Sequence, residues 1–223
     1  MPENQENSLV RGLLRIHAVI SRGLNVALER SQAYAHGEPS NPALLLGLAD
    51  YVQAFVSVLH GHHTGEDEIA FPAIHDRFPN APWSLLLDEH RAAVPILADL
   101  EQRGARLRDT PTAENCLPLA ETLEQLAILW SPHYSREEAL FTEPAVGGLV
   151  TREEQDALVA RLGEHSQQHT GPDYLVLPFL LYNLDGDERL AMSALFPQVV
   201  SQQLVPVVWK DKWVAMKPFL LEA

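Results

Sequence analysis

The stretch from His60 to Pro72, HGHHTGEDEIAFP, holds three histidines and three carboxylates within its first nine residues. Within it, His62 and Glu66 are four residues apart. On an α-helix, residues with this spacing lie one above the other on one face. An imidazole and a carboxylate placed in this way can converge on one first-row metal ion. The stretch therefore predicts part of a metal site on a helix.

A second copy of this spacing occurs in HYSREEALF, where His133 and Glu137 are four residues apart. A lone histidine precedes each pair at a similar distance along the chain: His17 before His62, and His90 before His133. The order predicts two helical hairpins of the same design. Packed antiparallel, they would bring four histidines and two carboxylates to the middle of a four-helix bundle.

Apolar residues recur every three or four positions through the first 143 residues, which predicts four helices. Ser8 is a candidate N-cap for the first, and Asn41-Pro42 is a typical start for the second. The predicted helices run from Ser8 to a polar turn at 37–42, from Pro42 to about Phe71-Pro72, onward from Pro82, and from about Ala113 to Glu143. Pro95 predicts a kink in the third helix, and Pro132 a kink or local break in the fourth.

The remainder of the chain has a different pattern. Residues 144–150 predict a break, and Thr151 with Glu154 occupies capping-box positions for a fifth helix that ends near Gln168. The last fifty residues are apolar and interrupted by prolines, which predicts short helices wrapped on the bundle, anchored by Trp209 and Trp213. We therefore expect an all-α protein: a metal-binding bundle at 8–145 and a helical extension at 150–223.

Composition narrows the class of protein. The chain has 223 residues and a net charge of −14, which argues against nucleic acid as a partner. With one cysteine, Cys116, it can form no intrachain disulfide, and we expect that thiol to be buried. We expect no apolar run to approach the length of a membrane span, and the polar first seven residues predict a disordered lead-in without a signal peptide. These features predict a soluble cytoplasmic protein with no membrane partner.

The run His62-x-x-x-Glu66-Asp-Glu-Ile-Ala-Phe-Pro resembles the signature of hemerythrin-like (HHE cation-binding) domains, and His133-x-x-x-Glu137-Glu138 resembles its second half. The resemblance covers roughly residues 8–143. It implies an antiparallel four-helix bundle of the hemerythrin type that holds two non-haem irons, with manganese or zinc as weaker alternatives. By that resemblance Glu66 and Glu137 would be the bridging carboxylates. The terminal nitrogen ligands would be His17, His62, His90 and His133.

The chain departs from the oxygen-carrying members of that family at one place. They have two histidines four apart on the third helix, whereas the positions four from His90 are Leu86 and Val94. A site with one fewer nitrogen ligand would keep an open position, which favours reaction over reversible oxygen carriage. Three nearby side chains could fill the gap instead: Asp88, Glu89 and His63.

Several other histidines, carboxylates and glycines lie near the predicted ligands or repeat their spacing. His63 with Asp67, and Glu138, are expected to support the ligands or lie on the surface, and His60 and His75 are expected on the surface. His165 and His169 are also four residues apart, but the predicted fifth helix has no carboxylate four residues from either of them. Gly61 and Gly65 indicate either close helix packing or room beside the metals.

Three functions are compatible with this pattern. The first is a di-iron oxidoreductase of the oxidase, oxygenase or peroxidase type, which activates dioxygen or peroxide and could enclose a small apolar substrate. The second is a non-catalytic protein that binds or senses oxygen, nitric oxide or iron. The third is a structural bundle whose metal only holds the helices together. A homodimer is compatible with each, and the sequence specifies neither the substrate nor the redox partner.

Overall fold

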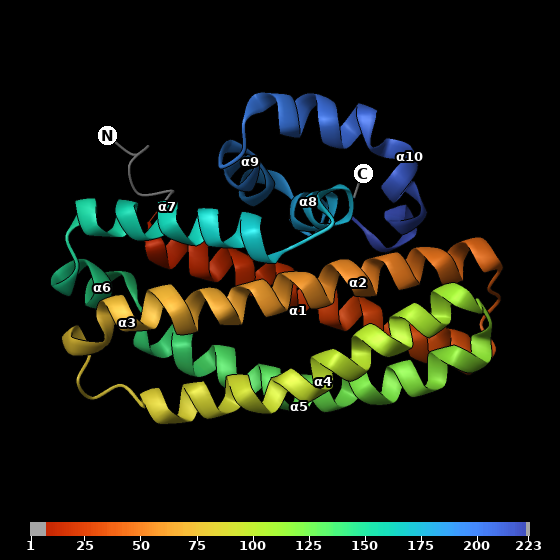
Figure 1. The fold of residues 1–223 in the computed structure, drawn as a ribbon, viewed down its shortest axis with the longest axis horizontal. Helices are drawn as coiled ribbons and strands as arrows, with labels where there is room; N and C mark the ends of the chain where they lie inside the picture. Colours follow the sequence, from red (N-terminus) through yellow and green to blue (C-terminus); the bar gives the residue numbers. More distant parts are fainter. Residues whose placement is uncertain (1–7, 222–223) are drawn as a thin grey trace.

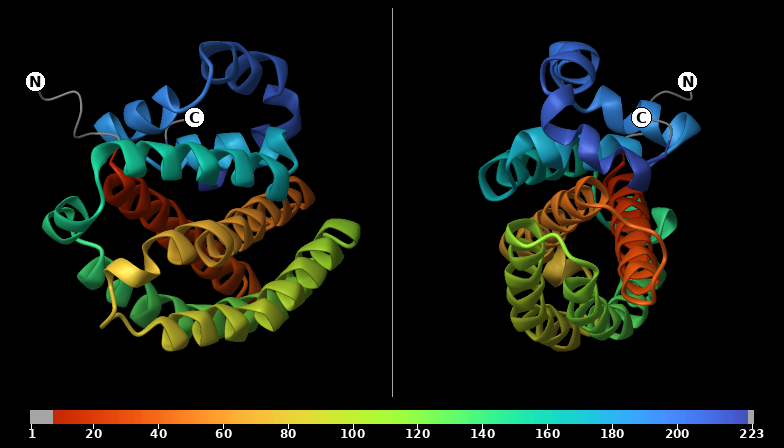
Figure 2. Two further views of the ribbon diagram at one scale, coloured as in Figure 1. Left: turned by 60° about the vertical axis from the view of Figure 1, so that its left-hand side comes forward. Right: turned by 90° about the vertical axis from the view of Figure 1, so that its right-hand side faces the viewer.

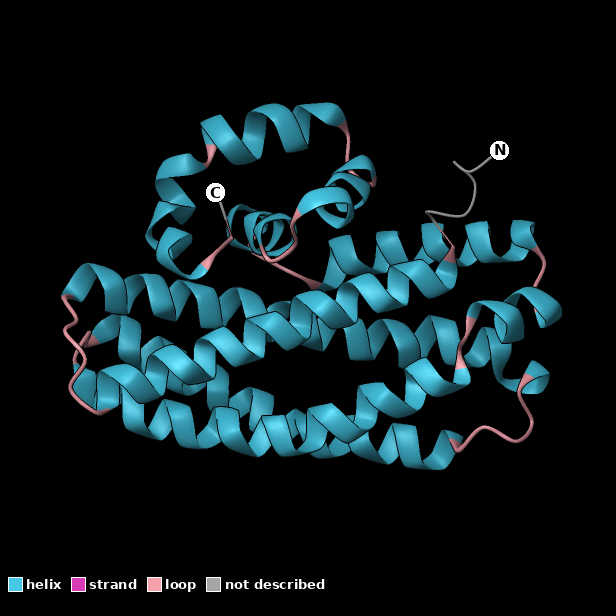
Figure 3. Ribbon diagram, turned by 180° about the vertical axis from the view of Figure 1, so that it is seen from behind, coloured by secondary structure: helices cyan, strands magenta, loops and turns pink. Residues whose placement is uncertain are grey.

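The structure is a computed structural model that describes residues 8–221, and every element in that range is helical. Seen from behind, this part of the chain contains helices and short loops and no strand (Figure 3). The prediction of an all-α fold is confirmed for these residues. The lead-in predicted for residues 1–7 falls outside them.

The four longest helices of the described chain lie side by side (Figure 1): α1 (Leu9–Ala35), α2 (Pro42–Gly65), α4 (Trp83–Asp109) and α5 (Cys116–Leu140). Helix α1 contacts α2 and α5, and α4 contacts the same two helices from the other side. Viewed from one end, the four helices surround a common interior (Figure 2). Their inward faces carry the buried core residues, among them Leu24, Phe55, Leu100 and Leu123.

Local sequence signals fix where the first two helices begin. The Ser8 hydroxyl accepts a hydrogen bond from the backbone N–H of Arg11, 3.0 Å away. The Asn41 side chain accepts one from the N–H of Leu44, also at 3.0 Å, with Pro42 as the first helical residue. Both predicted caps are confirmed, because these side chains satisfy N–H groups that the helix itself leaves unpaired.

Helix α2 does not simply end at its predicted boundary. The helical path continues through a π-helical turn, η1 (Glu66–Ala70), then α3 (Phe71–Ile74) and a 3₁₀ turn, η2 (His75–Arg77). Pro72 is tolerated because it lies in the first turn of α3, where its missing N–H is not needed. The π-helical turn begins at Glu66, a predicted ligand, and such turns are frequent at functional sites.

Two predicted interruptions of the helical structure do not occur. Helices α4 and α5 run without interruption through Pro95 and Pro132, so the local break, one of the two alternatives predicted at Pro132, does not occur, while the kinks at both prolines stay predictions. Both prolines are exposed, and the carbonyl groups that lose a partner there can face water. The break predicted at 144–150 is also wrong, because α6 (Glu143–Leu149) forms there, with its N-terminus capped by Thr142.

The C-terminal segment, residues 152–221, begins with a helix whose capping box is confirmed: Thr151 and Glu154 exchange side-chain and backbone hydrogen bonds. The rest is a series of short helical pieces, as predicted. In chain order the segment comprises α7 (Arg152–His169), α8 (Asp173–Tyr182), α9 (Gly186–Ala194), η4 (Val200–Val208), α10 (Lys210–Trp213) and η5 (Val214–Phe219). It lies on one side of the four long helices (Figure 2).

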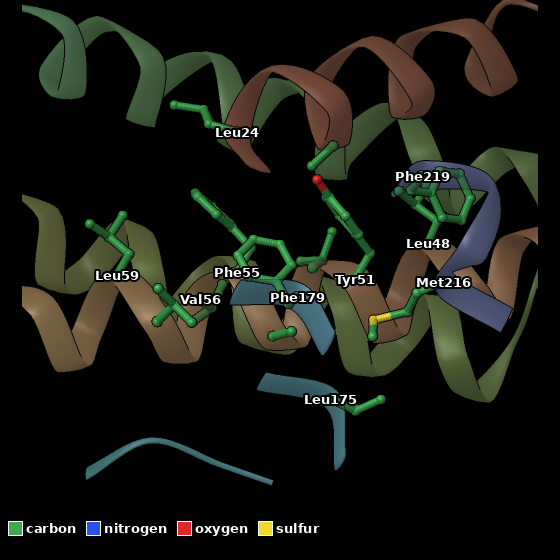
Figure 4. Packing of buried hydrophobic residues seen from close by; sticks show 14 of the residues in the cluster. Leu24, Leu48, Tyr51, Phe55, Val56, Leu59, Leu175, Phe179, Met216 and Phe219 are labelled. Carbon is green, nitrogen blue, oxygen red and sulfur yellow. The ribbon is translucent and has the colours of Figure 1, made fainter. Parts of the chain in front are cut away.

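The C-terminal segment packs mainly against helix α2. Figure 4 shows Tyr51 of α2 between Phe179 and Phe219, with ring centroids 4.9 Å and 5.8 Å away. Gly47 permits the closest approach, since a Cβ built there would lie 1.9 Å from the carbonyl oxygen of Ala215. Trp213 is buried and donates to the Val205 carbonyl, which agrees with its predicted role as an anchor.

The helical run Pro42–Arg77 contains an 18-residue window with a mean hydropathy of 1.6, long and apolar enough to cross a membrane by length and composition. The expectation that no apolar run approaches this length was therefore wrong. However, 61% of the window is buried inside the protein, because α2 is covered by long helices and by the C-terminal segment. Core helices of soluble proteins commonly meet the same criterion, so the window is weak evidence for a membrane span.

Candidate metal centre

The six side chains predicted as ligands meet in the middle of the four long helices. They form two groups, in each of which one donor atom per residue lies within 4.8 Å of the others. One group is His17, His62, Glu66 and Glu137, and the other is Glu66, His90, His133 and Glu137. Glu66 and Glu137 belong to both groups, so the two candidate metal-binding groups share two carboxylates.

The separations between donors are those expected around an ion. The His62 Nε2 atom lies 3.4 Å from Glu66 Oε2, and His133 Nε2 lies 3.5 Å from Glu137 Oε1. His17 Nε2 lies 3.2 Å from the other oxygen of Glu137. Two ligands at about 2.1 Å from one tetrahedral ion would be about 3.4 Å apart. Each predicted His-x-x-x-Glu pair thus has both donors at ligand separation.

Three of these histidines are held in place by a second carboxylate on the far side of the ring. In each case Nδ1 donates to the carboxylate, which leaves Nε2 directed at the centre. The pairs are His17 with Glu138 at 3.0 Å, His90 with Asp67 at 2.6 Å, and His133 with Glu89 at 3.1 Å. Carboxylates in this position fix the tautomer and orientation of a ligand histidine and raise its basicity. Arg136 in turn binds Glu89.

Several donor atoms at the centre are buried without any hydrogen-bond partner. They are Nε2 of His17, His62 and His63, Oε2 of Glu66, and both carboxylate oxygens of Glu137. A buried polar atom that lacks a partner costs free energy, and a folded protein rarely retains several together without a compensating ligand. Nitrogen and oxygen donors of this kind fit a first-row transition metal, so the residues present suit the cations that the sequence predicts.

The protonation preferences of these side chains also suit a metal site. Burial, reinforced by the nearby carboxylates of Glu137 and Asp67, raises the pKa of Glu66 well above its ordinary value. Burial also lowers the pKa of His62 and of His63, with the surrounding histidines adding to the effect. Neutral imidazole is the form that binds metal ions, so these histidines are held in the binding form at neutral pH.

Of the three residues predicted to fill the gap left by the histidine missing from the third helix, His63 lies beside the ligands. Its ring stacks on that of His90, with centroids 4.1 Å apart, and its donor lies within 4.8 Å of those of His90 and His133. The other two candidates for the gap do not reach it: Asp88 is exposed and pairs with Arg91, while Glu89 binds the outer nitrogen of His133. The structure therefore brings five histidines and two carboxylates together.

Aromatic side chains that the sequence analysis did not single out enclose the centre. The Trp130 ring lies 5.4 Å from the ring of His17 and 5.9 Å from that of His133, and its indole N–H donates to Ser21. On the other side, Phe71 stacks on His90 at 5.6 Å. Trp130 stands three residues before His133, a helical spacing that places both on one face and could have indicated its position.

Gly61 and Gly65 do not make room beside the centre. A Cβ on Gly61 would lie 2.4 Å from Thr170 Cγ2, and one on Gly65 would lie 3.3 Å from Leu162. Both glycines therefore face α7 and the residue that follows it, so close helix packing is the correct interpretation. The surface positions predicted for His60 and His75 are confirmed, since both are exposed.

Comparison with known families gives one match. The family model described as the hemerythrin HHE cation binding domain matches residues 8–143. That range contains all six predicted ligands, and it ends where α5 gives way to α6. Searches against curated proteins and against solved structures gave no match.

Proposed function

Because the chain belongs to the family of hemerythrin HHE cation-binding domains, we propose that it is a non-haem di-iron protein that binds dioxygen or a related small oxidant. In this proposal the four long helices form an antiparallel bundle of the hemerythrin type and hold both irons at its centre. The observation that carries the proposal is the membership of Glu66 and Glu137 in two neighbouring ligand groups. Two adjacent dications repel each other, and shared carboxylates offset that repulsion.

The ligand set is compatible with iron. Imidazole suits iron as well as copper and zinc, and two cations that share Glu66 and Glu137 would resemble the di-iron carboxylate centres of helical bundles. When bound, the irons supply the redox chemistry and the site at which the oxidant coordinates. Among the chain's own residues, Asp67, Glu89 and Glu138 hold the ligand rings, and Trp130 and Phe71 keep bulk water out.

The space beside the centre suits a molecule of two or three atoms. A void of about 10 Å³ lies next to His63 and His133 and is lined also by Glu89, Trp130 and aliphatic side chains, which is room for one water-sized molecule. A larger cavity of about 450 Å³ is lined by α2, α4 and residues near Gly171, and none of its lining residues belongs to the two ligand groups. The void supports a diatomic oxidant or gas more than an organic substrate bound at the irons.

The role of His63 distinguishes two of the candidate functions. With His63 as a fifth nitrogen donor, the open position that favoured reaction is filled, and this supports reversible binding or sensing of oxygen or nitric oxide. Activation of dioxygen or peroxide, with turnover as an oxidase or peroxidase, is the second candidate. It gains support if His63 stays outside the iron coordination shell and leaves that position open.

The test begins with metal-free protein loaded with iron under anaerobic conditions and then exposed to oxygen. We expect absorption bands at visible wavelengths that disappear when oxygen is removed and return when it is readmitted. Bands that form once and decay, with measurable consumption of oxygen or peroxide, would instead support activation. A Glu66→Ala variant should give no bands, and a variant identical to the wild type would contradict the proposal.

A His63→Ala variant sharpens the choice. If His63 is an iron ligand, its loss should open a position, destroy reversibility and raise the consumption of oxidant. The matched control is His60→Ala, which removes an exposed histidine from the same helix. If the His63→Ala variant binds oxygen as reversibly as the wild type, His63 is only a neighbour of the ligands.

A further inference from the structure

A second cluster of metal-binding side chains lies outside the centre, where α7 packs on η1. It consists of Glu68 from η1 with His165 and His169 from α7, and their donor atoms lie within 4.8 Å of one another. The two histidines come from the C-terminal segment and the glutamate from the π-helical turn after α2. The family match ends before either histidine, so membership of the family does not assign this cluster.

His165 is the unusual member of the cluster. It is 94% buried, and neither of its ring nitrogens has a hydrogen-bond partner. The Nδ1 side faces Gly65, where a Cβ would lie 3.5 Å away, and Nε2 faces Glu68. A buried imidazole with no partner on either nitrogen costs free energy, which a ligand at Nε2 would offset.

The geometry around Nε2 is that of a ligand pair. His165 Nε2 lies 3.4 Å from Glu68 Oε2, without the alignment of a hydrogen bond. This matches the separation of His62 and Glu66 at the centre and the edge of about 3.4 Å expected around a tetrahedral zinc ion. Glu68 is exposed, so water can reach the remaining coordination position.

His169 is oriented by its own helix. Its Nδ1 donates to the carbonyl oxygen of His165, 2.9 Å away, which fixes the tautomer and leaves Nε2 unprotonated. The rings of His165 and His169 are nearly parallel, with centroids 3.9 Å apart, as expected for histidines four residues apart on a helix. Two such histidines and a glutamate are a recurrent ligand set for zinc.

We propose that Glu68, His165 and His169 bind one divalent first-row transition ion, with zinc as the ion that best fits two imidazoles and one carboxylate. The ion would tie α7 to the helical turn that also carries Glu66, two residues before Glu68. The C-terminal segment would thereby be fastened to the centre by a metal bridge. The acidic chain, with a net charge of −14, favours the approach of such an ion.

The test measures zinc bound to the full-length chain at free zinc concentrations fixed by a chelator. We expect wild type to bind one more zinc per chain than His169→Ala, whatever number the central site takes up. Both His169→Ala and Glu68→Gln should weaken that additional zinc by roughly tenfold or more. Zinc should also raise the melting temperature of the wild type more than that of His169→Ala.

His36→Ala is the matched control, because His36 is also an exposed histidine at a helix end whose Nδ1 bonds the carbonyl four residues back. It should keep the additional zinc. A Glu137→Ala chain, impaired at the central site, should keep it as well, so failure at the centre and failure here are distinguishable. Equal zinc binding by wild type and His169→Ala, or equal loss in His36→Ala, would overturn the proposal.

Discussion

The four long helices and the C-terminal segment bury different kinds of side chain. At the centre of the long helices lie buried histidines and two buried glutamates, several of whose atoms have no hydrogen-bond partner. The C-terminal segment covers α2 with apolar residues such as Phe179, Met216 and Phe219. The centre carries unpaired polar groups that favour metal binding at the expense of stability, whereas the apolar contact with the C-terminal segment adds stability. Four experiments test this difference between the two regions.

Removing a shared carboxylate should have the largest effect. In Glu137→Ala, both groups of ligands lose a member, and we expect the central site to lose both ions in elemental analysis. Glu121→Ala, an exposed glutamate on the same helix, should keep them. Full metal content in Glu137→Ala, with an unchanged circular dichroism spectrum, would show that Glu137 is not shared.

The second largest effect is expected from adding one methyl group where α2 contacts the C-terminal segment. Gly47→Ala forces Ala215 and its neighbours to move, and overpacking of this kind costs about 1–3 kcal/mol in the free energy of unfolding. Gly12→Ala, on α1 with nothing near its Cβ, should instead stabilise the protein by about 0.5–1 kcal/mol. Chemical denaturation measures both. Metal affinity that falls in parallel with stability in Gly47→Ala would mean that the two regions are not separable.

A neutral replacement at the centre should stabilise the metal-free protein while impairing metal binding. The pKa of Glu66 is raised in the folded state, so its ionisation opposes folding as the pH rises above the ordinary glutamate value. We expect metal-free Glu66→Gln to be more stable to unfolding than wild type at pH 7, because wild type must bury a carboxyl group that is ionised in the unfolded chain. The difference in stability should shrink at pH 4, where Glu66 is largely protonated in the unfolded chain as well. An equal advantage at both pH values in urea denaturation would refute this explanation.

The smallest effect is expected from an outer carboxylate. Asp67→Asn weakens the hydrogen bond that holds His90, and loss of such a partner costs about tenfold in metal affinity. Asp88→Asn is the control, because Asp88 is exposed and its ion pair is with Arg91, not with a ligand histidine. Competition with a chromophoric chelator would measure both affinities. Equal affinities would indicate that packing alone orients His90.

Much of the fold and the centre follows from local sequence. The caps at Ser8, Asn41 and Thr151, and the pairs His62-Glu66 and His133-Glu137, all depend on residues three or four apart on one helix. Helix geometry fixes such distances whatever else the chain does. That is why the local parts of these predictions correspond to features of the structure. The meeting of His17 and His90 at the same centre follows from the repeated order of the two hairpins.

Other features depended on how the helices pack against one another. The assignment of His63 to the gap left beside His90, the use of Gly61 and Gly65 to admit α7, and the enclosure by Trp130 required the interhelical contacts. The clearest case is Glu68, which reaches His165 only because the C-terminal segment folds back on α2. Residue spacing was enough to predict which groups one helix places together, because the backbone sets the distances between them. Apart from the meeting implied by the repeated hairpins, contacts between helices could be found only from the folded structure, because they depend on the packing of side chains distant in the sequence.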